Sequence, residues 1–400
     1  MSPGAVAITG MGCVCAAGNN LPECMESLFR GERNLGVPMR IVSDQATTYP
    51  VFEVADDLAS LETRNTPDIS RTGRFALKVA FEAIGDAGLD REFLRSKRVG
   101  VCMGTTVGCV MNNGDFYRAY LKGQDPDMAD ITRFLRSNPA ASVAREFDLT
   151  GPCQTIVNAC SSGTDAIRIG ALWIKSGICD IVLTGGADEL SHVACNGFAS
   201  LMITDSSPCK PFDRDRKGLN LGEGAAMLIL ESEGVRRMRS KEARTFVLGS
   251  SASCDAYHLT APHPDGRGLR RALKEGIVSS GAEVKDIAFV NAHGTGTQDN
   301  DRVESRILHE VLPGVPFLST KGYTGHTLGA AGAIEAVFTV ACLEQGRIPK
   351  SAGFSSPDPQ LPASPAGSEM EIRGSVAVSD SLAFGGHNGV LVFGTGGDPT

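Results

Sequence analysis

The chain has 400 residues, 42% of them hydrophobic, which is enough for one large domain or two to three ordinary ones. Its formal net charge of −8 argues against a nucleic-acid partner, because phosphate binding needs a basic surface. No apolar run of about 18 residues is present, so we expect no membrane span, and the first residues read as a strand and not as a signal peptide.

The 12 cysteines are scattered through apolar segments and show no zinc-type spacing. Without an export signal, all of them except Cys160 are predicted to be reduced thiols that act as small core residues in the cytoplasm. We therefore expect no metal site. Cys160 needs a separate argument.

In chain order, the first half alternates strands and helices. We expect a strand at 5–9 that ends in a turn at Gly10 and Gly12, helices at 22–30 and 71–88, a strand at 99–104, a polar helical insertion at 112–149, strands at 181–187 and 222–230, and a surface helix at 232–244.

From residue 245 the same alternation returns. The expected elements are strands at 245–249, 287–292 and 315–319, helices at 269–281, 299–311 and 326–344, and a closing pair of strands around 375–394. Continuous apolar strands that alternate with helices predict largely parallel sheets covered by helices on both faces. The repeat predicts an internal duplication into two halves, 1–244 and 245–400.

Cys160 ends a β-prone run that begins at Gln154, and a helix with apolar residues at helical spacing follows over 164–175. This junction places the thiol at the positive end of a helix dipole, which favours the thiolate. A thiolate is what attacks an acyl carbonyl. A buried, inert cysteine in a small-residue turn would give the same pattern.

Two histidines and a lysine stand in glycine-flanked settings in the second half. His293 directly follows a strand, and Lys321 and His326 share a glycine-rich stretch before a small-residue helix. Flanking glycines let a substrate approach the backbone closely. At the start of that helix, His326 is expected to be a neutral imidazole.

Four stretches together resemble the β-ketoacyl-acyl-carrier-protein synthases, with the elongating type II kind (KAS II-like) fitting best. They are Asn158-Ala-Cys160-Ser-Ser-Gly163, His293-Gly-Thr-Gly-Thr297, Lys321-x-x-x-Gly-His326-x-x-Gly-Ala-Ala-Gly332 and Phe384-Gly-Gly-x-Asn388. The resemblance runs in order over nearly the whole chain. It implies the thiolase-like fold, an α/β architecture of two similar halves packed as five layers (α-β-α-β-α), usually in an obligate homodimer.

The activity implied is a decarboxylative condensation that extends a fatty-acid or polyketide chain by two carbons. Cys160 would take the acyl chain, with the backbone N–H groups of Cys160 and Phe384 as the oxyanion hole. His293 and His326 would bind malonyl thioester and stabilise its enolate. Lys321 would hold this network with Glu304 as its ionic partner, although a purely structural ion pair is an equal alternative.

The resemblance also implies a substrate carried on the phosphopantetheine arm of acyl carrier protein, with no bound cofactor. The remaining residues that it assigns are Thr295 and Thr297 for the pantetheine arm, Asn388 as a supporting residue, and Val107, Phe198 and Phe384 for the acyl pocket and its gate. Hydroxyls that merely satisfy a turn are the alternative for the two threonines.

Departures from the family pattern leave the acyl substrate open. The family usually has Asn-Ser-Phe-Gly-Phe-Gly-Gly-Thr-Asn where this chain has Asp380-Ser-Leu-Ala-Phe384-Gly-Gly-His387-Asn388, and Gln298 replaces a common proline. A non-catalytic chain-length subunit or an acyl-CoA-binding protein would not require Cys160 with two histidines. The chain as the active member of a heterodimer stays open.

An acidic carrier protein would need a local basic patch on this acidic chain. Arg71 and Arg74 lie near the start of the predicted helix at 71–88 and are the candidates. A solvated helix face is the equally favoured alternative.

Overall fold

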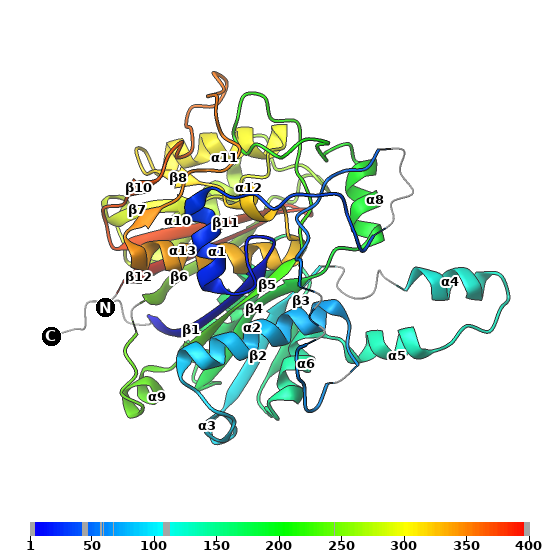
Figure 1. Cartoon of the computed structure of the whole chain (residues 1–400). Helices are drawn as coiled ribbons and strands as arrows, with labels where there is room; N and C mark the ends of the chain where they lie inside the picture. The colour runs from blue at the N-terminus through cyan, green and yellow to red at the C-terminus, as the bar shows by residue number, and fades with distance from the viewer. Residues whose placement is uncertain are drawn as a thin grey trace.

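The computed structural model describes residues 5–41, 47–56, 58, 60–66, 68–106, 113–243 and 245–395 (Figure 1). Its strands are β1 (Val6–Cys15), β2 (Val99–Gly104), β3 (Cys153–Ile156), β4 (Ile181–Asp188), β5 (Gly224–Glu231), β6 (Thr245–Cys254), β7 (Ile287–Asn291), β8 (Phe317–Leu318), β9 (Arg347–Ile348), β10 (Met370–Glu371), β11 (Val376–Ala383) and β12 (His387–Thr395).

The α-helices are α1 (Leu21–Arg30), α2 (Arg71–Ala87), α3 (Arg91–Arg95), α4 (Gly114–Leu121), α5 (Ala129–Arg136), α6 (Pro139–Glu146), α7 (Ser162–Lys175), α8 (His192–Ser200), α9 (Glu233–Met238), α10 (Arg267–Ser280), α11 (Gln298–Val311), α12 (Lys321–Thr324) and α13 (Ala331–Gln345). Two 3₁₀ turns, η2 (Val284–Asp286) and η3 (Leu328–Ala330), complete the elements used below.

The strand order shows that the two halves repeat one plan. The large sheet runs β3-β2-β4-β5-β1-β6-β12-β11-β7-β8, so the second half mirrors the first. In each half the two outer strand pairs are parallel and the two inner pairs are antiparallel. Strands β1 and β6 pair antiparallel and join the halves. The expectation of largely parallel sheets is therefore wrong, because the inner strands reverse direction.

Three apolar cores define the layers. The central core packs α7 and α13 against strands of both halves, while α2 and α6 cover the outer face of the first half. Helices α10 and α11 cover the outer face of the second half. Figure 1 shows α13 between α2 below and α11 above. This is the five-layer, thiolase-like architecture that the resemblance implied.

The first strand is longer than the sequence pattern predicts. Gly10 and Gly12 lie inside β1 and not in a turn. A Cβ on Gly10 would lie 2.2 Å from the carbonyl oxygen of Ala83, and one on Gly12 would lie 2.4 Å from that of Val79. Helix α2 therefore packs directly on the strand backbone, and this close approach explains both glycines.

Most predicted elements are present with small changes in their ends, but several short elements were not expected. They include the helices α3, α8 and α12 and the two-residue strands β9 and β10. The helix expected from residue 326 begins only at Ala331, after η3. The stretch Leu328–Gln345 is long and apolar enough to cross a membrane by composition, but 89% of it is buried in the protein core.

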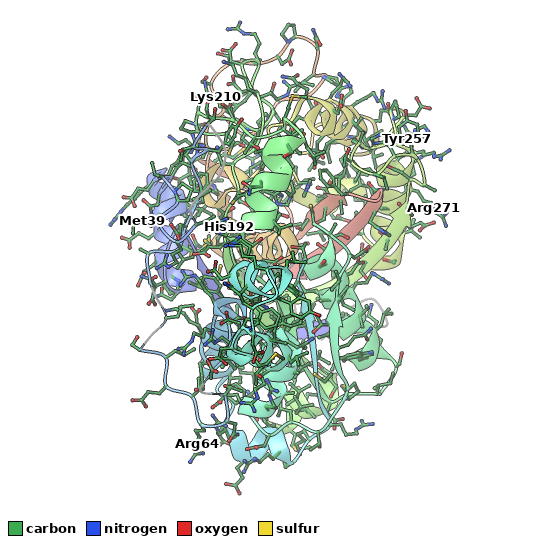
Figure 2. All side chains as sticks on the ribbon, turned by 90° about the vertical axis from the view of Figure 1, so that its right-hand side faces the viewer. Met39, Arg64, His192, Lys210, Tyr257 and Arg271 are labelled. Carbon is green, nitrogen blue, oxygen red and sulfur yellow. The ribbon has the colours of Figure 1, made fainter. Side chains whose placement is uncertain are left out.

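Helices α4 and α5 form an arm that projects from the rest of the molecule. Neither helix has a buried residue, and Figure 1 shows both at the right edge. Figure 2 views the molecule from that side, with His192 at the start of α8 just above the arm. Large apolar side chains are exposed on the arm, including Tyr120 (65%), Leu121 (82%) and Leu135 (71%).

Candidate active site

Cys160 occupies a sharp turn between β3 and α7. Ala159 has a left-handed φ of 47°, and Cys160 is 3% exposed. The Asn158 side chain donates a 2.6 Å hydrogen bond to Asp165 on the first turn of α7, which fixes the turn. The predicted strand-to-helix position of Cys160 is confirmed, with the helix beginning at residue 162.

Burial opposes the thiolate that was expected for Cys160 at this helix end. Burial raises the pKa of the Cys160 thiol to about 11, while the Lys321 charge and a hydrogen bond from the Phe384 N–H act in the opposite direction. Complete desolvation therefore outweighs the nearby positive charge.

Lys321 fixes the position of His293 through two hydrogen bonds. The Lys321 Nζ donates to Nδ1 of His293 at 3.0 Å and to its carbonyl oxygen at 2.6 Å. Its ion pair is with Glu335 on α13, and both side chains are almost completely buried. The predicted pairing of Lys321 with Glu304 is wrong, because Glu335 reaches the ammonium from the central helix.

Glu304 supports His293 by another route. Its carboxylate accepts the backbone N–H groups of His293 at 2.7 Å and Gly294 at 2.8 Å, and the Asn300 side chain at 2.9 Å. Burial raises the pKa of Glu304 to about 7. Glu304 thus fixes the backbone of the histidine loop that follows β7, and this loop positions the imidazole.

Backbone hydrogen bonds hold His326, which belongs to the second half of the chain, against the first half. Its backbone N–H donates to Asn220 at 2.8 Å, and its carbonyl oxygen accepts from Gly222 at 3.0 Å. Its Nδ1 accepts the backbone N–H of Leu328 at 3.1 Å. Because Nδ1 is an acceptor, the proton of the neutral ring is on Nε2.

Both imidazoles are neutral. Burial is the main cause that lowers the pKa of His293 and His326 well below the ordinary value, and the Lys321 charge adds to it. The expectation of a neutral His326 is confirmed, although burial and not the helix end is the main cause. His293 also accepts at Nδ1, from the ammonium of Lys321. Each ring therefore carries its proton on Nε2 and can donate it as a hydrogen bond.

The three groups converge. Side-chain nitrogen and sulfur atoms of Cys160, His293 and His326 all lie within 4.8 Å of one another, and the two imidazole centroids are 5.3 Å apart. Such a sulfur and nitrogen set is also close enough to bind a metal ion, so the absence of metal from this site stays a prediction. A nucleophile beside two neutral hydrogen-bond donors can accept an acyl group and stabilise a developing oxyanion.

A cavity of about 230 Å³ gives access to this cluster. Thr295 and Thr297 lie on its wall with their hydroxyls 2.8 Å apart. Phe198 and Phe384 stack with centroids 5.5 Å apart, and Phe198 also contacts the edge of His326. Asn388, which was predicted as a supporting residue, also lines the cavity, and its side chain donates to Asp255 at 3.3 Å and to the Gly386 carbonyl at 3.0 Å.

Comparison with known proteins identifies the family. Residues 4–234 match the β-ketoacyl synthase N-terminal domain, and residues 245–355 match the β-ketoacyl synthase C-terminal domain. The chain belongs to the β-ketoacyl synthase family. The curated relatives described next, both named 3-oxoacyl-[acyl-carrier-protein] synthase 2, make this β-ketoacyl synthase one of the KAS II type, an acyltransferase-class condensing enzyme.

Curated relatives cover almost the entire chain. A 3-oxoacyl-[acyl-carrier-protein] synthase 2 of Synechocystis sp. is 33% identical over 406 residues, with 97% of each chain covered. An enzyme of the same name from Staphylococcus aureus is 30% identical over 407 residues, again with 97% of each covered.

Solved structures show the same fold. The ishigamide ketosynthase/chain length factor matches with a TM-score of 0.92 at 30% identity and covers 99% of this synthase and 100% of that chain. A ketosynthase in complex with its chain length factor from Xenorhabdus doucetiae matches with a TM-score of 0.88 at 30% identity and covers 98% of each chain.

Two buried carboxylates of this synthase were missed by sequence reasoning. Glu335 was hidden in the predicted helix at 326–344, although a single acid in an apolar helix is a usable signal. Asp188 accepts hydrogen bonds from Thr105, Thr106 and Gly329 and joins the end of β4 to η3, close to His326. Burial raises the pKa of Asp188 to about 6. The partners of Asp188 come from distant segments, so no local sequence pattern indicates them.

Two of the residues named from sequence do not line the described cavity, and a third is not described. Val107 lies outside the described residues. Arg71 is ion-paired at 2.7 Å with the buried Glu223, and Arg74 donates to the Leu58 carbonyl at 3.1 Å. Both arginines are partly buried against the chain, so the expectation that they form an exposed basic patch is wrong.

Proposed function

We propose that this β-ketoacyl synthase extends an acyl chain by two carbons, with malonyl thioester on acyl carrier protein as the donor. The observation that carries the proposal is the convergence of the Cys160 thiol with two neutral imidazoles at the end of a cavity. Curated relatives named as acyl-carrier-protein synthases support the carrier. The chemistry needs no bound cofactor, because the substrates arrive on the carrier's phosphopantetheine arm.

In the first half-reaction the Cys160 sulfur attacks the acyl thioester. The backbone N–H groups of Cys160 and Phe384 stabilise the tetrahedral oxyanion, and the Phe384 N–H is already hydrogen-bonded to the Cys160 sulfur. Collapse forms the acyl–Cys160 thioester and breaks the bond to the carrier sulfur. The proton of the Cys160 thiol is transferred to the departing carrier sulfur, so the step is balanced without a resident base.

In the second half-reaction His293 and His326 bind the malonyl thioester carbonyl. Both Nε2–H groups donate to this oxygen as carbon dioxide leaves and the enolate forms. The enolate carbon attacks the acyl–Cys160 carbonyl, the bond to the Cys160 sulfur breaks, and the departing thiolate takes a proton from water. The product is the carrier-bound 3-oxoacyl chain with two more carbons.

The surrounding residues position these groups. Lys321, held by Glu335, keeps the His293 proton on Nε2 by donating to Nδ1. Thr295 and Thr297 lie where a pantetheine arm would enter and can bond its amides. The acyl chain lies beyond the stacked pair of Phe198 and Phe384, with the latter as its gate. The protein works in the cytoplasm.

The test is a condensation assay with acyl-carrier and malonyl-carrier thioesters, read by mass spectrometry of the carrier protein. We expect a product two carbons longer than the acyl primer, across a panel of primers that defines the preferred length. Hydrolysis of acyl carrier with no condensed product for any primer would contradict the proposal.

A homodimer is the simplest assembly, and a heterodimer with a related chain-length subunit is the second candidate. The exposed apolar residues of α4 and α5 support a partner subunit. The two structural neighbours described above, each titled with a chain length factor, support the heterodimer. The heterodimer is the assembly that we associate with a specialised polyketide or polyene pathway.

Size-exclusion chromatography, alone and with candidate chain-length subunits, distinguishes these assemblies. We expect Leu121→Glu together with Leu135→Glu on the arm to yield a monomer. Val278→Glu is the matched control, because Val278 is 80% exposed on the distant α10. A wild-type chain that elutes as a monomer with and without every candidate would contradict both assemblies.

A further inference from the structure

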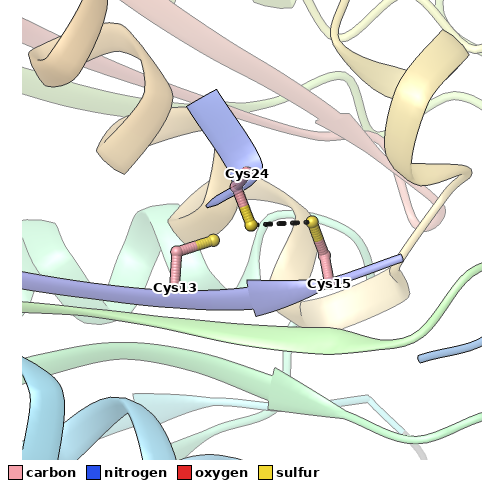
Figure 3. Close-up of side chains that lie close together, drawn as sticks. All are labelled: Cys13, Cys15 and Cys24. Carbon is pink, nitrogen blue, oxygen red and sulfur yellow. Dashed lines mark hydrogen bonds between the residues drawn. The ribbon is translucent and has the colours of Figure 1, made fainter. Parts of the chain in front are cut away.

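Three cysteines outside the catalytic cavity form a second cluster. Cys13 and Cys15 lie on β1 and Cys24 lies on α1, and the three sulfur atoms are all within 4.8 Å of one another. Figure 3 shows the side chains converging between the strand and the helix. The Cys15 and Cys24 sulfurs are 3.7 Å apart, and the cysteines are 0–1% exposed.

This spacing matches that of sulfur ligands around one metal ion. Three thiolates bound to an ion at about 2.3 Å in a plane lie about 4.0 Å apart. The alternation of β1 directs Cys13 and Cys15 to the same face, because side chains two residues apart in a strand point the same way. Helix α1 brings Cys24 over that face. The fold therefore builds the cluster from rigid elements.

We propose that Cys13, Cys15 and Cys24 form a binding site for one soft monovalent metal ion, copper(I) being the biological candidate. An all-sulfur ligand set selects soft ions. Among the described residues the cluster holds three ligands and not the four that a structural zinc site requires.

The surroundings favour cation entry. A surface groove of about 930 Å³ is lined by Met11, on the same face of β1 as the cysteines, and by Met25, next to Cys24. Methionine thioethers are soft ligands that can pass a copper(I) ion along. Glu82 and Asp86 also line the groove and accept the backbone N–H groups of Cys13 and Met11. Their negative charge attracts cations toward this end of β1.

Ion binding would release protons from the thiols, and no electron transfer is required. A bound ion would tie α1 to β1, so we expect the thermal midpoint of unfolding to rise with copper(I).

The test uses Cys160→Ser protein, since the Cys160, His293 and His326 cluster could bind the same ion. The protein is titrated without oxygen with copper(I) supplied from a competing chelator, and bound copper is counted by native mass spectrometry. We expect one copper(I) ion per chain. A further Cys15→Ser or Cys24→Ser substitution is expected to weaken copper(I) binding by on the order of 100-fold or more. Cys342→Ser is the control, because Cys342 is a buried cysteine in neither cluster.

X-ray absorption of the copper-loaded Cys160→Ser protein keeps the test decisive if a serine in this core unfolds the chain. A sulfur-only shell of three ligands is expected. Four results would overturn the proposal: no bound copper, binding unchanged by Cys15→Ser, zinc bound in preference to copper(I), or a mass loss of two hydrogens that shows a Cys15–Cys24 disulfide instead.

Discussion

The two sulfur-containing clusters of this protein are equally buried but differ in what surrounds them. Cys160 shares its site with two imidazoles whose orientation is fixed by Lys321 and backbone groups, and a cavity reaches it. The cluster of Cys13, Cys15 and Cys24 packs in the apolar core between β1 and α1. Burial alone therefore does not make a cysteine inert. Hydrogen-bond donors and access for a substrate decide whether it can act as a nucleophile.

The largest expected effect separates Cys160 from the other buried cysteines. Cys160→Ala should lower the condensation rate by at least about 10³-fold, because no covalent intermediate can form. Malonyl decarboxylation should persist, since the histidines that stabilise the enolate remain. Product analysis of the carrier measures both. Cys342→Ala is the control and should keep the condensation rate, and a Cys160→Ala enzyme with a near wild-type rate would refute the assignment.

The next prediction concerns the buried ion pair of Lys321 and Glu335 beside the candidate active site. Lys321→Ala leaves Glu335 buried without its ionic partner, so we expect the free energy of unfolding to fall by about 3–5 kcal/mol. Urea denaturation provides the measurement. Adding Glu335→Gln should restore most of the loss, whereas adding Glu304→Gln should restore little, since Glu304 bonds backbone N–H groups. The reverse order of rescue would favour Glu304 as the partner.

Each histidine should contribute to the enolate step and not to acyl transfer. Removing one donor with His293→Ala or His326→Ala should slow malonyl decarboxylation by about 10²- to 10³-fold. Acylation of Cys160 should continue in both variants. His309→Ala, which removes an exposed histidine on α11, is the control. Decarboxylation at the wild-type rate in both variants would remove these residues from the proposed mechanism.

A smaller and graded effect tests the resting state of Cys160. With a pKa of about 11, the thiolate fraction should rise about tenfold for each pH unit below that value. The rate of alkylation of Cys160 by iodoacetamide should therefore increase up to pH 10 without a plateau, as followed by peptide mass spectrometry. A plateau between pH 7 and 8 would show that the helix end stabilises the thiolate more than burial disfavours it.

Local pattern predicted more of the fold than of the site's polar network. The helix at 71–88 and the strand at 99–104 are present almost as predicted, because hydrophobic periodicity and flanking glycines act over short distances. Gly10 and Gly12 were wrongly predicted to form a turn, because a glycine in the sequence can mark either a turn or a strand position that a helix contacts closely. Only the folded structure distinguishes these two uses.

The chemistry of the motif residues could be read from sequence, whereas their partners could not. Cys160, His293 and His326 stand in local glycine-rich settings that mark them, and the structure brings them together. The choice of Glu335 over Glu304 depends on how α13 crosses behind His293. The ion pair of Arg71 with Glu223 likewise depends on contact between distant segments, so a pattern of charges on one helix face could not reveal it.

The central claim is that Cys160 alone among the cysteines carries the acyl chain. The most direct measurement is intact-protein mass spectrometry, followed by peptide mapping, after exposure of the wild-type and Cys160→Ala proteins to a panel of acyl-carrier thioesters. We expect a mass gain of one acyl group on wild-type protein, mapped to Cys160, and no gain on Cys160→Ala. An acyl group on another residue, or equal acylation of both proteins, would contradict the account.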